Sequence, residues 1–321
     1  MAVYTHVPAE ALADLLARYD VGTLVSAKGI AEGVENSNYL VETTTNRFIL
    51  TLYEKRVAAG DLPFFLALLD HLAAAGLPVP PAIPDREGRA IQEVEGRPAC
   101  LIRFLPGVSL TSPTPAQARA AAVEMGRMHR ALEGFTPERP NTLGVDSWEP
   151  LLRRCGSDLE TISPGLYDEI AGHLDAVQAF WPAPGTEPTS VIHADLFPDN
   201  VLMLGERVTG LIDFYFACSD LRLYDLAVMH TSWSFDPTGV RYNAAVGRAL
   251  LDGYAASFGL SDEDRQRLLT LAGGACIRFA LTRAWDWLNT PADALVTRKD
   301  PLAYTRRLGF YEQAGSSLFD A

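Results

Sequence analysis

Two nearby segments decide the fold: VIHADLFPDNVLM, from Val191 to Met203, and LIDFYF, from Leu211 to Phe216. In the first, an apolar run ends in the tripeptide HAD, whose last residue is Asp195, and Asn200 follows after four further residues. In the second, an apolar run leads directly to Asp213. Short apolar runs of this kind indicate strands. Because the three polar residues sit just past apolar runs, we expect a rigid core to fix their positions.

These residue types at this spacing indicate phosphoryl transfer from ATP. A hydroxyl nucleophile needs a carboxylate that accepts its proton, and Asp195 is the candidate general base. Mg²⁺ prefers hard oxygen ligands and keeps several waters, so two protein oxygens are enough. The amide oxygen of Asn200 and the carboxylate of Asp213 are the candidate metal ligands. We expect His193 to be a buried, hydrogen-bonded brace of the loop and Asp199 to be a solvated charge.

The composition is that of a soluble globular protein with one large or two ordinary domains: 321 residues, 48% hydrophobic and 21% charged. No apolar run reaches membrane-spanning length, and the N-terminus does not resemble a signal peptide. The four cysteines have no CxxC or CxxH spacing, which favours buried free thiols in a reducing cytosol. A net charge of −13 argues against nucleic acid or an anionic membrane as a partner. We therefore expect a cytoplasmic protein with neither partner.

The chain changes character near residue 105. Before it, strands are expected at 21–30, 39–43, 48–53, 89–94 and 97–105, with helices at 8–19 and 61–75. A proline-rich connector follows, and then helical patterns dominate, with helix starts near Thr114, Ser261 and Asp300. This layout predicts an α+β, bilobal, protein-kinase-like fold. Its parts are an N-terminal nucleotide-binding lobe, residues 1–105, and a mainly helical C-terminal lobe with the catalytic loop and substrate site, residues 106–321.

In such a fold the nucleotide is expected between the two lobes. The backbone from Ile102 to Leu105 is placed to hydrogen-bond the adenine edge, which makes Ile102 and Phe104 candidates. The loop from residue 29 to 38 is placed to cover the phosphates, because main-chain amides concentrate positive potential on an anion. The phosphate candidates in this loop are Gly33, Asn36, Ser37 and Asn38.

The chain resembles the aminoglycoside phosphotransferase and choline kinase group of protein-kinase-like folds, and within it most closely the homoserine kinases of the ThrB type. The superfamily motifs are HADLFPDN and IDF. The segments ENSNY, LTLYEKR and DFYFACSD point to homoserine kinase. The resemblance covers nearly the whole chain and is carried by GVENSNYLV (33–41), ILTLYEKR (49–56), DLPFFLALLDHLAAAGLPVP (61–80), LIDFYFACSDLRLYDLAV (211–228) and RFALTRAWDWL (278–288).

The resemblance implies a reaction: ATP and L-homoserine give ADP and O-phospho-L-homoserine, a step toward threonine. ATP and Mg²⁺ are the implied cofactors. Three departures from protein kinases concern the grip on the phosphates. Thr51 stands where a lysine would usually reach them, and Lys55 or Lys28 are the available substitutes. There is also no GxGxxG, and the helix at 61–75 has no glutamate to pair with a lysine.

Homoserine is a small zwitterion, so its site should offer an arginine, a carboxylate and apolar or aromatic walls. On a helical wheel Arg278 borders the apolar stripe of its helix and Arg283 lies on the opposite side. The sequence leaves the roles open among the candidates of the helical half, which are Tyr215, Asp220, Arg222, Trp233, Arg278, Arg283 and Trp285.

Two other functions compete with this one. Another small-molecule kinase of the same fold would act on an aminoglycoside, choline or another amino alcohol. A polycationic aminoglycoside needs several converging acids, whereas residues 274–290 contain two arginines and only Asp286. A nucleotide-binding pseudokinase scaffold would be expected to have Asp195 or Asp213 replaced, and both are present.

Overall fold

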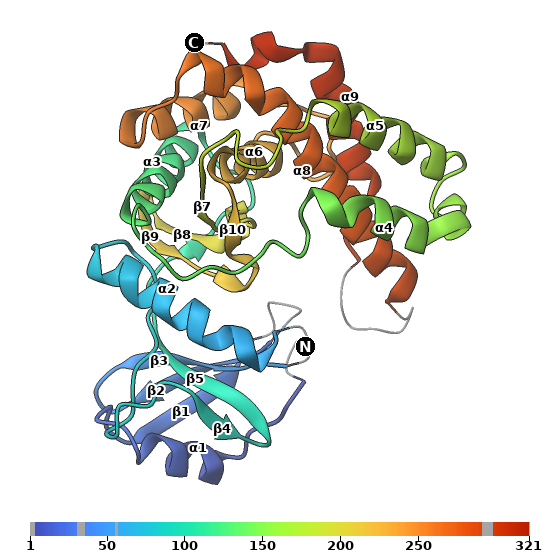
Figure 1. Ribbon diagram of the computed structural model, residues 1–321. Coiled ribbons are helices and arrows are strands. Elements are labelled where there is room, and N and C mark those ends of the chain that lie inside the picture. Colours follow the sequence, from blue (N-terminus) through green and yellow to red (C-terminus); the bar gives the residue numbers. More distant parts are fainter. Residues whose placement is uncertain (1–3, 31–35, 55–56, 291–297, 321) are drawn as a thin grey trace. The chain divides into compact units, whose positions relative to one another are not determined.

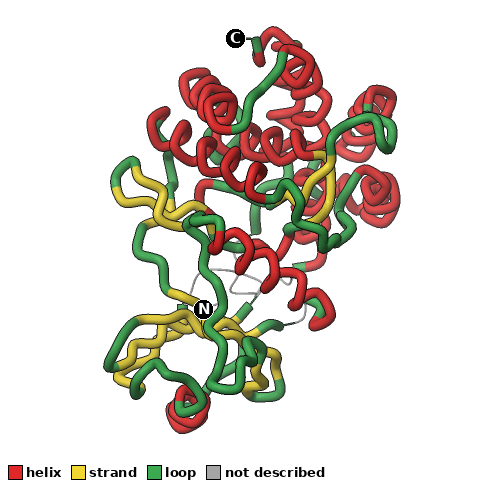
Figure 2. Tube along the Cα trace, turned by 60° about the vertical axis from the view of Figure 1, so that its left-hand side comes forward, coloured by secondary structure: helices red, strands yellow, loops and turns green. Residues whose placement is uncertain are grey.

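The structure is a computed structural model that describes residues 4–30, 36–54, 57–290 and 298–320. The described chain divides into two compact units, one formed by residues up to Pro106 and the other by residues from Gly107 onward. Most of the strand residues in the first unit belong to one sheet, whereas helices make up most of the second unit, as Figure 2 shows.

The first unit is built on a five-stranded antiparallel sheet in the order β1-β2-β3-β5-β4. Residues alternate between buried and more exposed along β2, the pattern of a strand with one face in the core. The strands predicted from the sequence are confirmed, most with shorter bounds: β1 (Leu24–Gly29), β2 (Ser37–Thr43), β3 (Arg47–Leu52), β4 (Gln92–Val94) and β5 (Arg97–Arg103).

Two helices lie on opposite faces of this sheet, α1 (Ala9–Leu16) and α2 (Leu62–Ala74), as Figure 1 shows. Helix α1 buries Leu12, Leu15 and Leu16 in one core with inward-facing residues of β2, β3 and β5. Helix α2 begins after Asp61 with a proline in its first turn, and a short 3₁₀ turn, Ala59–Asp61, precedes it. Both helices were predicted from the spacing of apolar residues in the sequence, and the structure confirms them.

The second unit is organised around the long helix α8, which packs against α4, α5, α6 and α9. Capping boxes begin α3, at Thr114 and Gln117, and α8, at Ser261 and Asp264, which confirms the helix starts expected there. The helices are α3 (Pro115–Ala131), α4 (Val145–Cys155), α5 (Leu166–Phe180), α6 (Arg222–Trp233), α7 (Ala244–Ser257), α8 (Asp262–Asn289) and α9 (Leu302–Ala314).

Short strands form an island within these helices. The first ladder pairs β7 (Thr189–Ile192) with β10 (Cys218–Leu221), and the second runs in the order β6 (Val108–Ser109), β8 (Val201–Leu204), β9 (Arg207–Leu211). The register Val201↔Leu211 places the residue before β8 beside the residue after β9. The two ladders therefore bring together the loop that follows β7 and the turn that follows β9.

Cys100, Cys155, Cys218 and Cys276 are all free and buried, as expected. Burial raises the pKa of the Cys100 thiol to about 11 and that of Cys276 to about 12. The helices of the described residues include none that is long and apolar enough to cross a membrane.

Candidate active site

Asp195 lies in the loop after β7, directly behind a backbone position of unusual conformation. Ala194 has φ +63°, in the left-handed region that a non-glycine residue seldom adopts. Such a conformation persists only when its surroundings hold it, and both sides of Ala194 are held. Its N–H donates to Asp225 at 2.8 Å, and its carbonyl accepts from Nη1 of Arg278 at 2.5 Å. The turn that presents Asp195 is thus fixed by two other helices.

The carboxylate of Asp225, on α6, organises this loop. It accepts hydrogen bonds from the backbone N–H of His193 at 2.9 Å and from Nε2 of His129 at 3.0 Å, besides the Ala194 bond. Nδ1 of His129 contacts the hydroxyl of Tyr254 at 2.9 Å. Burial opposes the charge of Asp225, but the hydrogen bonds and the nearby histidines hold the pKa of its carboxyl below the ordinary value.

His193 is fully buried and makes two hydrogen bonds that define its tautomer. Its Nδ1 accepts from the backbone N–H of Asp195 at 3.3 Å, so Nε2 carries the proton and donates to the carbonyl of Ile212 at 3.0 Å. Burial lowers the pKa of His193. The prediction of a bracing, buried histidine is confirmed, and the brace joins the Asp195 loop to the residue before Asp213.

Asn200 links Asp195 to the segment that carries Asp213. Its side-chain Nδ2 donates to the backbone carbonyl of Asp195 at 2.8 Å and to its carboxylate at 3.3 Å. The backbone N–H of Ile212 donates to the carbonyl of Asn200 at 3.0 Å. Asp213, the next residue along the chain, is therefore held close to Asn200. Asp213 itself has a left-handed backbone, φ +66°, at the start of the turn Phe214–Phe216. The structure therefore brings Asp195, Asn200 and Asp213 together, as the sequence predicts.

The donor set fits a hard divalent cation. Because Nδ2 of Asn200 is turned to Asp195, the amide oxygen Oδ1 is left as an acceptor, and no described residue donates to it. One amide oxygen and one carboxylate, completed by waters and phosphate oxygens, are a ligand set that Mg²⁺ uses. The described part of the chain has no cluster of three or more His, Cys, Asp or Glu side chains suited to a metal. Asp199 is exposed, with Nζ of Lys299 at 4.0 Å from its carboxylate.

Two of the substrate candidates are hydrogen-bonded to the loop that carries Asp195. Trp233 is buried at the end of α6 and donates from its indole N–H to the carbonyl of Leu196 at 2.8 Å. Arg278 is 3% exposed on α8, and it donates to Ala194 as described above. Each has a backbone acceptor in the loop as its partner, so both are placed to position the loop that carries Asp195.

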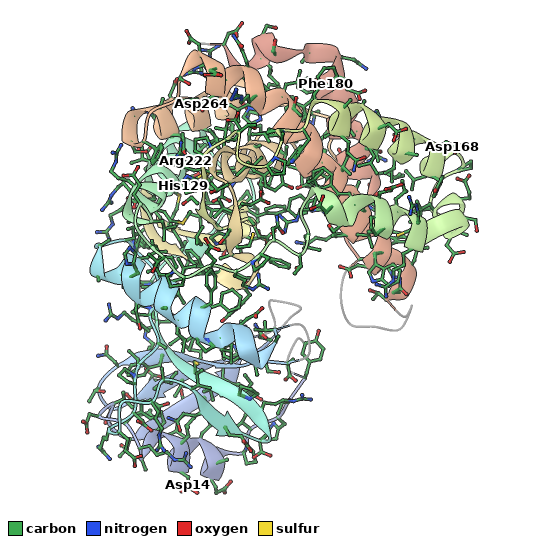
Figure 3. All side chains as sticks on the ribbon, in the orientation of Figure 1. Asp14, His129, Asp168, Phe180, Arg222 and Asp264 are labelled. Atoms are coloured by element: carbon green, nitrogen blue, oxygen red, sulfur yellow. The ribbon has the colours of Figure 1, made fainter. Side chains whose placement is uncertain are left out.

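Three further candidates are not brought to Asp195. Asp220 pairs with Ser190 on the far end of the β7–β10 ladder and accepts from Nδ2 of Asn141. Arg222 lies with its guanidinium 4.4 Å from the ring centre of Phe258, in a surface pocket that also contains Asp264; Figure 3 labels both residues. Trp285 is stacked under the exposed Arg154, at 4.0 Å.

The last two candidates lie at the site. Tyr215 is half-buried in the turn after Asp213. Arg283 is half-buried on α8 and lies near enough to Asp195 for the carboxylate to act on it electrostatically. Sequence reasoning missed its two neighbours on α9, Tyr304 and Arg307, which lie against it. The sequence did contain one sign of them, a tyrosine and an arginine three residues apart on one helix. The other residues of that helix have the pattern of ordinary core and surface positions, so the pair did not stand out.

In the first unit, the expectation of a loop through residue 38 is wrong for Ser37 and Asn38. Both belong to β2, where Ser37 pairs with Leu52 and Asn38 with Thr51 of β3. Ser37 accepts from the backbone N–H groups of Tyr4 and Thr5 and donates to Glu54, and Asn38 accepts from the Thr51 hydroxyl at 2.7 Å. These side chains therefore brace the sheet.

Three of the remaining nucleotide candidates lie in or next to strands of the same sheet. Asn36 is buried, and its side chain accepts from the backbone N–H of Glu54 at 3.4 Å. Ile102 is in β5, and Phe104 follows it with Arg47 at 5.1 Å over its ring. Gly33 and Lys55 lie outside the described residues.

Comparisons with known proteins place these observations in a family. Residues 26–266 match the phosphotransferase enzyme family. A homoserine kinase of Acidiphilium cryptum is 51% identical over 317 residues, 99% of this chain and 98% of that protein. A homoserine kinase of Zymomonas mobilis is 49% identical over 316 residues, 98% of each chain.

Solved structures share the fold at low sequence identity. Spectinomycin phosphotransferase in complex with ADP and spectinomycin superimposes with a TM-score of 0.73 at 14% identity, covering 96% of this chain and 100% of that one. Amicoumacin kinase in complex with AMP-PNP and Ca²⁺ gives 0.67 at 14% identity, covering 94% and 96%. These likenesses confirm the predicted α+β, protein-kinase-like fold.

Proposed function

The chain belongs to the homoserine kinases of the phosphotransferase enzyme family, and on that premise we propose that Asp195, Asn200 and Asp213 carry its reaction. The reaction is the phosphorylation of L-homoserine by ATP, which gives O-phospho-L-homoserine and ADP, a step of threonine biosynthesis. One observation carries the assignment of residues: the side chain of Asn200 is hydrogen-bonded to Asp195 while its backbone is bonded to the residue before Asp213.

Asp195 acts as the general base. The homoserine hydroxyl gives its proton to the Asp195 carboxylate as its oxygen bonds to the γ-phosphorus, and the bond from that phosphorus to the ADP oxygen breaks. Proton transfer to a positioned carboxylate contributes about 10²–10⁴ in rate. The rest of the acceleration in phosphoryl transfer is positioning and electrostatic stabilisation. The hydrogen bonds from Asp225, His193 and Arg278 serve that positioning. They hold the backbone of three successive residues, 193 to 195, and so keep Asp195 in place.

Mg²⁺ would be held by the Asn200 amide oxygen and the Asp213 carboxylate, where it would offset the negative charge of the phosphates. The assignment rests on the orientation of the Asn200 amide and on the chemistry of the donor set. Residues 1–105 form the nucleotide-binding lobe in this proposal, with the backbone around Ile102 and Phe104 at the adenine and the segment from Gly33 to Asn36, with Lys55, at the phosphates. Residues 106–321 carry the catalytic loop and the acceptor site.

The cellular setting follows from composition. The net charge of −13 disfavours nucleic acid and anionic membranes as partners. Four buried free thiols are typical of the reducing cytoplasm, which is where we place the enzyme. A kinase for another small alcohol is the second candidate, because the solved neighbours with this fold include enzymes named for other acceptors, such as an ethanolamine kinase of Plasmodium vivax with a TM-score of 0.61.

The test is ADP release with L-homoserine, serine, choline and an aminoglycoside, and with no acceptor. We expect homoserine to give the highest kcat/KM and phosphorus NMR to place the phosphate on its side-chain hydroxyl. Serine should be poor because its shorter chain misplaces the hydroxyl relative to Asp195. A higher kcat/KM for choline or the aminoglycoside would exclude homoserine as the preferred acceptor, while ADP release without any acceptor turnover would indicate a different activity.

A further inference from the structure

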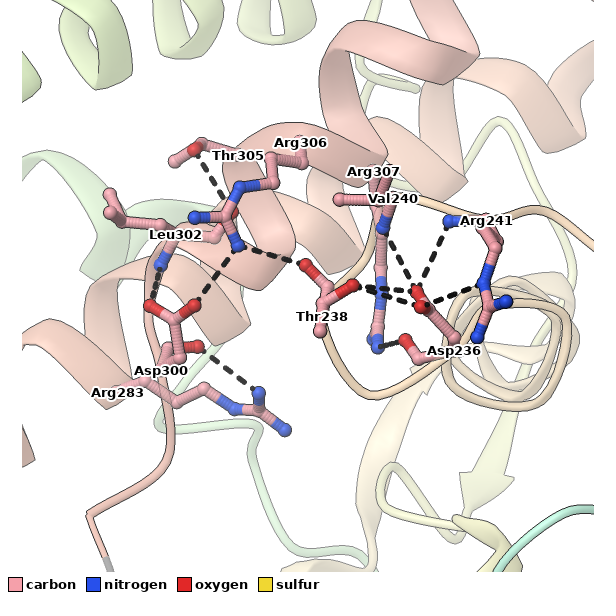
Figure 4. A network of polar contacts seen from close by, with 10 residues as sticks. All are labelled: Asp236, Thr238, Val240, Arg241, Arg283, Asp300, Leu302, Thr305, Arg306 and Arg307. Atoms are coloured by element: carbon pink, nitrogen blue, oxygen red, sulfur yellow. Dashed lines mark hydrogen bonds and ion pairs between the residues drawn. The ribbon is translucent and has the colours of Figure 1, made fainter.

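Two arginines from different helices lie against one tyrosine ring. The guanidinium carbon of Arg283, on α8, is 4.6 Å from the centre of the Tyr304 ring, and that of Arg307, on α9, is 4.3 Å from the same point. Figure 4 shows the two arginine side chains extending from their helices toward the same region. Two positive charges are therefore held close together in a site that is largely shielded from water.

Neither arginine is neutralised by a carboxylate among the described residues. Arg283 makes one hydrogen bond there, from Nη1 to the backbone carbonyl of Asp300 at 3.3 Å, and Arg307 donates to the backbone carbonyl of Asp236 at 3.1 Å. The two carboxylates themselves point to other partners: that of Asp300 pairs with Arg306 at 3.0 Å and that of Asp236 with Arg241 at 3.3 Å. A guanidinium has five N–H donors, so most of the Arg283 donors remain available.

The ring between them carries an unused donor. The Tyr304 hydroxyl is fully buried, with no hydrogen-bond partner among the described residues, and Nε of the 4% exposed Arg307 is in the same state. A buried polar group without a partner costs about 1–3 kcal/mol, and one such group in a native site calls for a reason. Here the two unpaired donors and a half-buried guanidinium belong to three residues that meet at one ring, and such a group of donors favours an anionic ligand.

The group is close to the reacting end of the enzyme. The Asp195 carboxylate acts electrostatically on both Arg283 and Tyr304. A row of rings also links them to the catalytic loop, since Phe197 lies 4.9 Å from Phe279, and Phe279 lies 5.1 Å from Tyr304. Burial, reinforced by the charge of Arg307, lowers the pKa of Arg283, whereas a bound anion would raise it. The surroundings thus favour an anionic ligand within reach of Asp195.

We propose that Arg283, together with the Tyr304 hydroxyl and with Arg307 behind them, binds the carboxylate of the amino-acid acceptor. This inference rests on the proposed function, because it concerns the acceptor of the same reaction. Arg278 is assigned a positioning role instead, because it is only 3% exposed and bonds to the loop that carries Asp195, although its Nε also has no partner among the described residues. The site explains how an enzyme of this fold selects an amino acid over a plain amino alcohol: without the carboxylate, the arginine pair and the tyrosine hydroxyl stay unpaired.

The experiment compares two acceptors, L-homoserine and 3-amino-1-propanol, which lacks the carboxylate. In the unaltered enzyme we expect homoserine to be favoured by roughly 10³ in kcat/KM, the size of discrimination that unpaired buried groups produce. Arg283→Met should lower kcat/KM for homoserine by about 10²-fold or more and change that for 3-amino-1-propanol by less than about 3-fold, because only the first substrate loses a partner. Arg154→Met, which removes an exposed arginine stacked on the same helix, is the control and should change neither.

A loss of equal size with both acceptors would overturn the proposal, because it would make Arg283 a structural residue. No loss with homoserine would overturn it as well. Failure of the proposed function gives a different result: the unaltered enzyme itself would not phosphorylate homoserine.

Tyr304→Phe provides a second test that a purely structural role would not pass. Removing an unpaired buried hydroxyl should leave the melting temperature unchanged or slightly higher. At the same time kcat/KM should fall by about 10-fold for homoserine and not for 3-amino-1-propanol, the effect of one lost hydrogen bond to a charged group. A lower melting temperature with no change in discrimination would contradict the assignment of the hydroxyl.

Discussion

The side-chain amide of Asn200 donates to both the backbone carbonyl and the carboxylate of Asp195, at 2.8 and 3.3 Å. One residue therefore orients the proposed base and, with its opposite face, offers an oxygen to the metal. Variants at this position should affect both functions, whereas variants at Asp195 and Asp213 should separate them.

Asp195→Asn should lower kcat by about 10²–10⁴, because an amide cannot accept the proton of the acceptor hydroxyl. ATP binding should change little, because the new side chain has nearly the same size and shape. Single-turnover assays would give the rate and calorimetric titration the affinity for ATP. Near-normal turnover in this variant would exclude Asp195 as the base.

Asp213→Ala should abolish Mg²⁺-dependent turnover, because it removes the one charged ligand assigned to the metal. Asn200→Ala should be milder, since a neutral ligand is lost and water can enter. The check is turnover as a function of Mg²⁺ concentration. Asp199→Ala is the matched control, because this carboxylate is exposed beside Asn200. A larger defect in Asp199→Ala than in Asp213→Ala would mean that the metal ligands are wrongly assigned.

Asp225→Ala should destabilise the protein by about 3 kcal/mol or more, because three buried donors, the amides of His193 and Ala194 and the His129 ring, lose their acceptor at about 1–3 kcal/mol each. Tyr254→Phe, which removes only the outer partner of His129, should cost about 1 kcal/mol. Urea unfolding would measure both changes. Equal losses would show that the carboxylate does not organise the loop.

Stability should fall as the pH drops below about 6.5, partly through His230. Burial lowers the pKa of this histidine from 6.5 to about 3, and its Nδ1 lies 2.7 Å from the Tyr311 hydroxyl. Below pH 6.5 His230 therefore binds a proton in the unfolded chain but not in the folded protein. This lowers the free energy of unfolding by up to about 1.4 kcal/mol for each pH unit. In His230→Phe the slope of unfolding free energy against pH, between 6.5 and 5, should be shallower by about one proton. An unchanged slope would exclude this contribution.

Glycines in two helices should respond oppositely to alanine. A Cβ at Gly253, in α7, would lie 2.4 Å from the carbonyl oxygen of Arg119, on α3, so Gly253→Ala forces the two helices apart and should cost about 1–3 kcal/mol. A Cβ at Gly309, in α9, meets nothing within 4 Å, and Gly309→Ala should stabilise by up to about 1 kcal/mol. Melting temperatures of the two variants test the contrast.

The sequence was sufficient to predict that Asp195, Asn200 and Asp213 are held in place at strand ends, because local rules determine their positions. Asp195 and Asp213 follow the short strands β7 and β9, Asn200 directly precedes β8, and the pairing of β8 with β9 brings Asn200 beside the residue before Asp213. The helix starts at Thr114 and Ser261 were equally local, since a capping box involves residues three apart.

The acceptor side could not be predicted in the same way. Tyr304 and Arg307 are brought to Arg283 only by the packing of α9 on α8, which no spacing in the sequence encodes. Similarly, Ser37 and Asn38 read as loop residues by type, but their pairing with Leu52 and Thr51 of β3 extends the strand. Long-range partners decided both outcomes.

Helix α8 has a further consequence for the range of acceptors. Arg278 and Arg283 are five residues apart, a rise of about 7.5 Å along one rigid axis. Arg278 is bonded to the loop that carries Asp195, and Arg283 is the proposed carboxylate ligand. The helix therefore fixes the distance between the base and the carboxylate of the acceptor. Acceptors one methylene shorter or longer than homoserine would present the hydroxyl at the wrong distance. Changes in acceptor length should therefore require a change of register on α8, because a one-residue insertion between the two arginines would turn them by about 100° relative to each other.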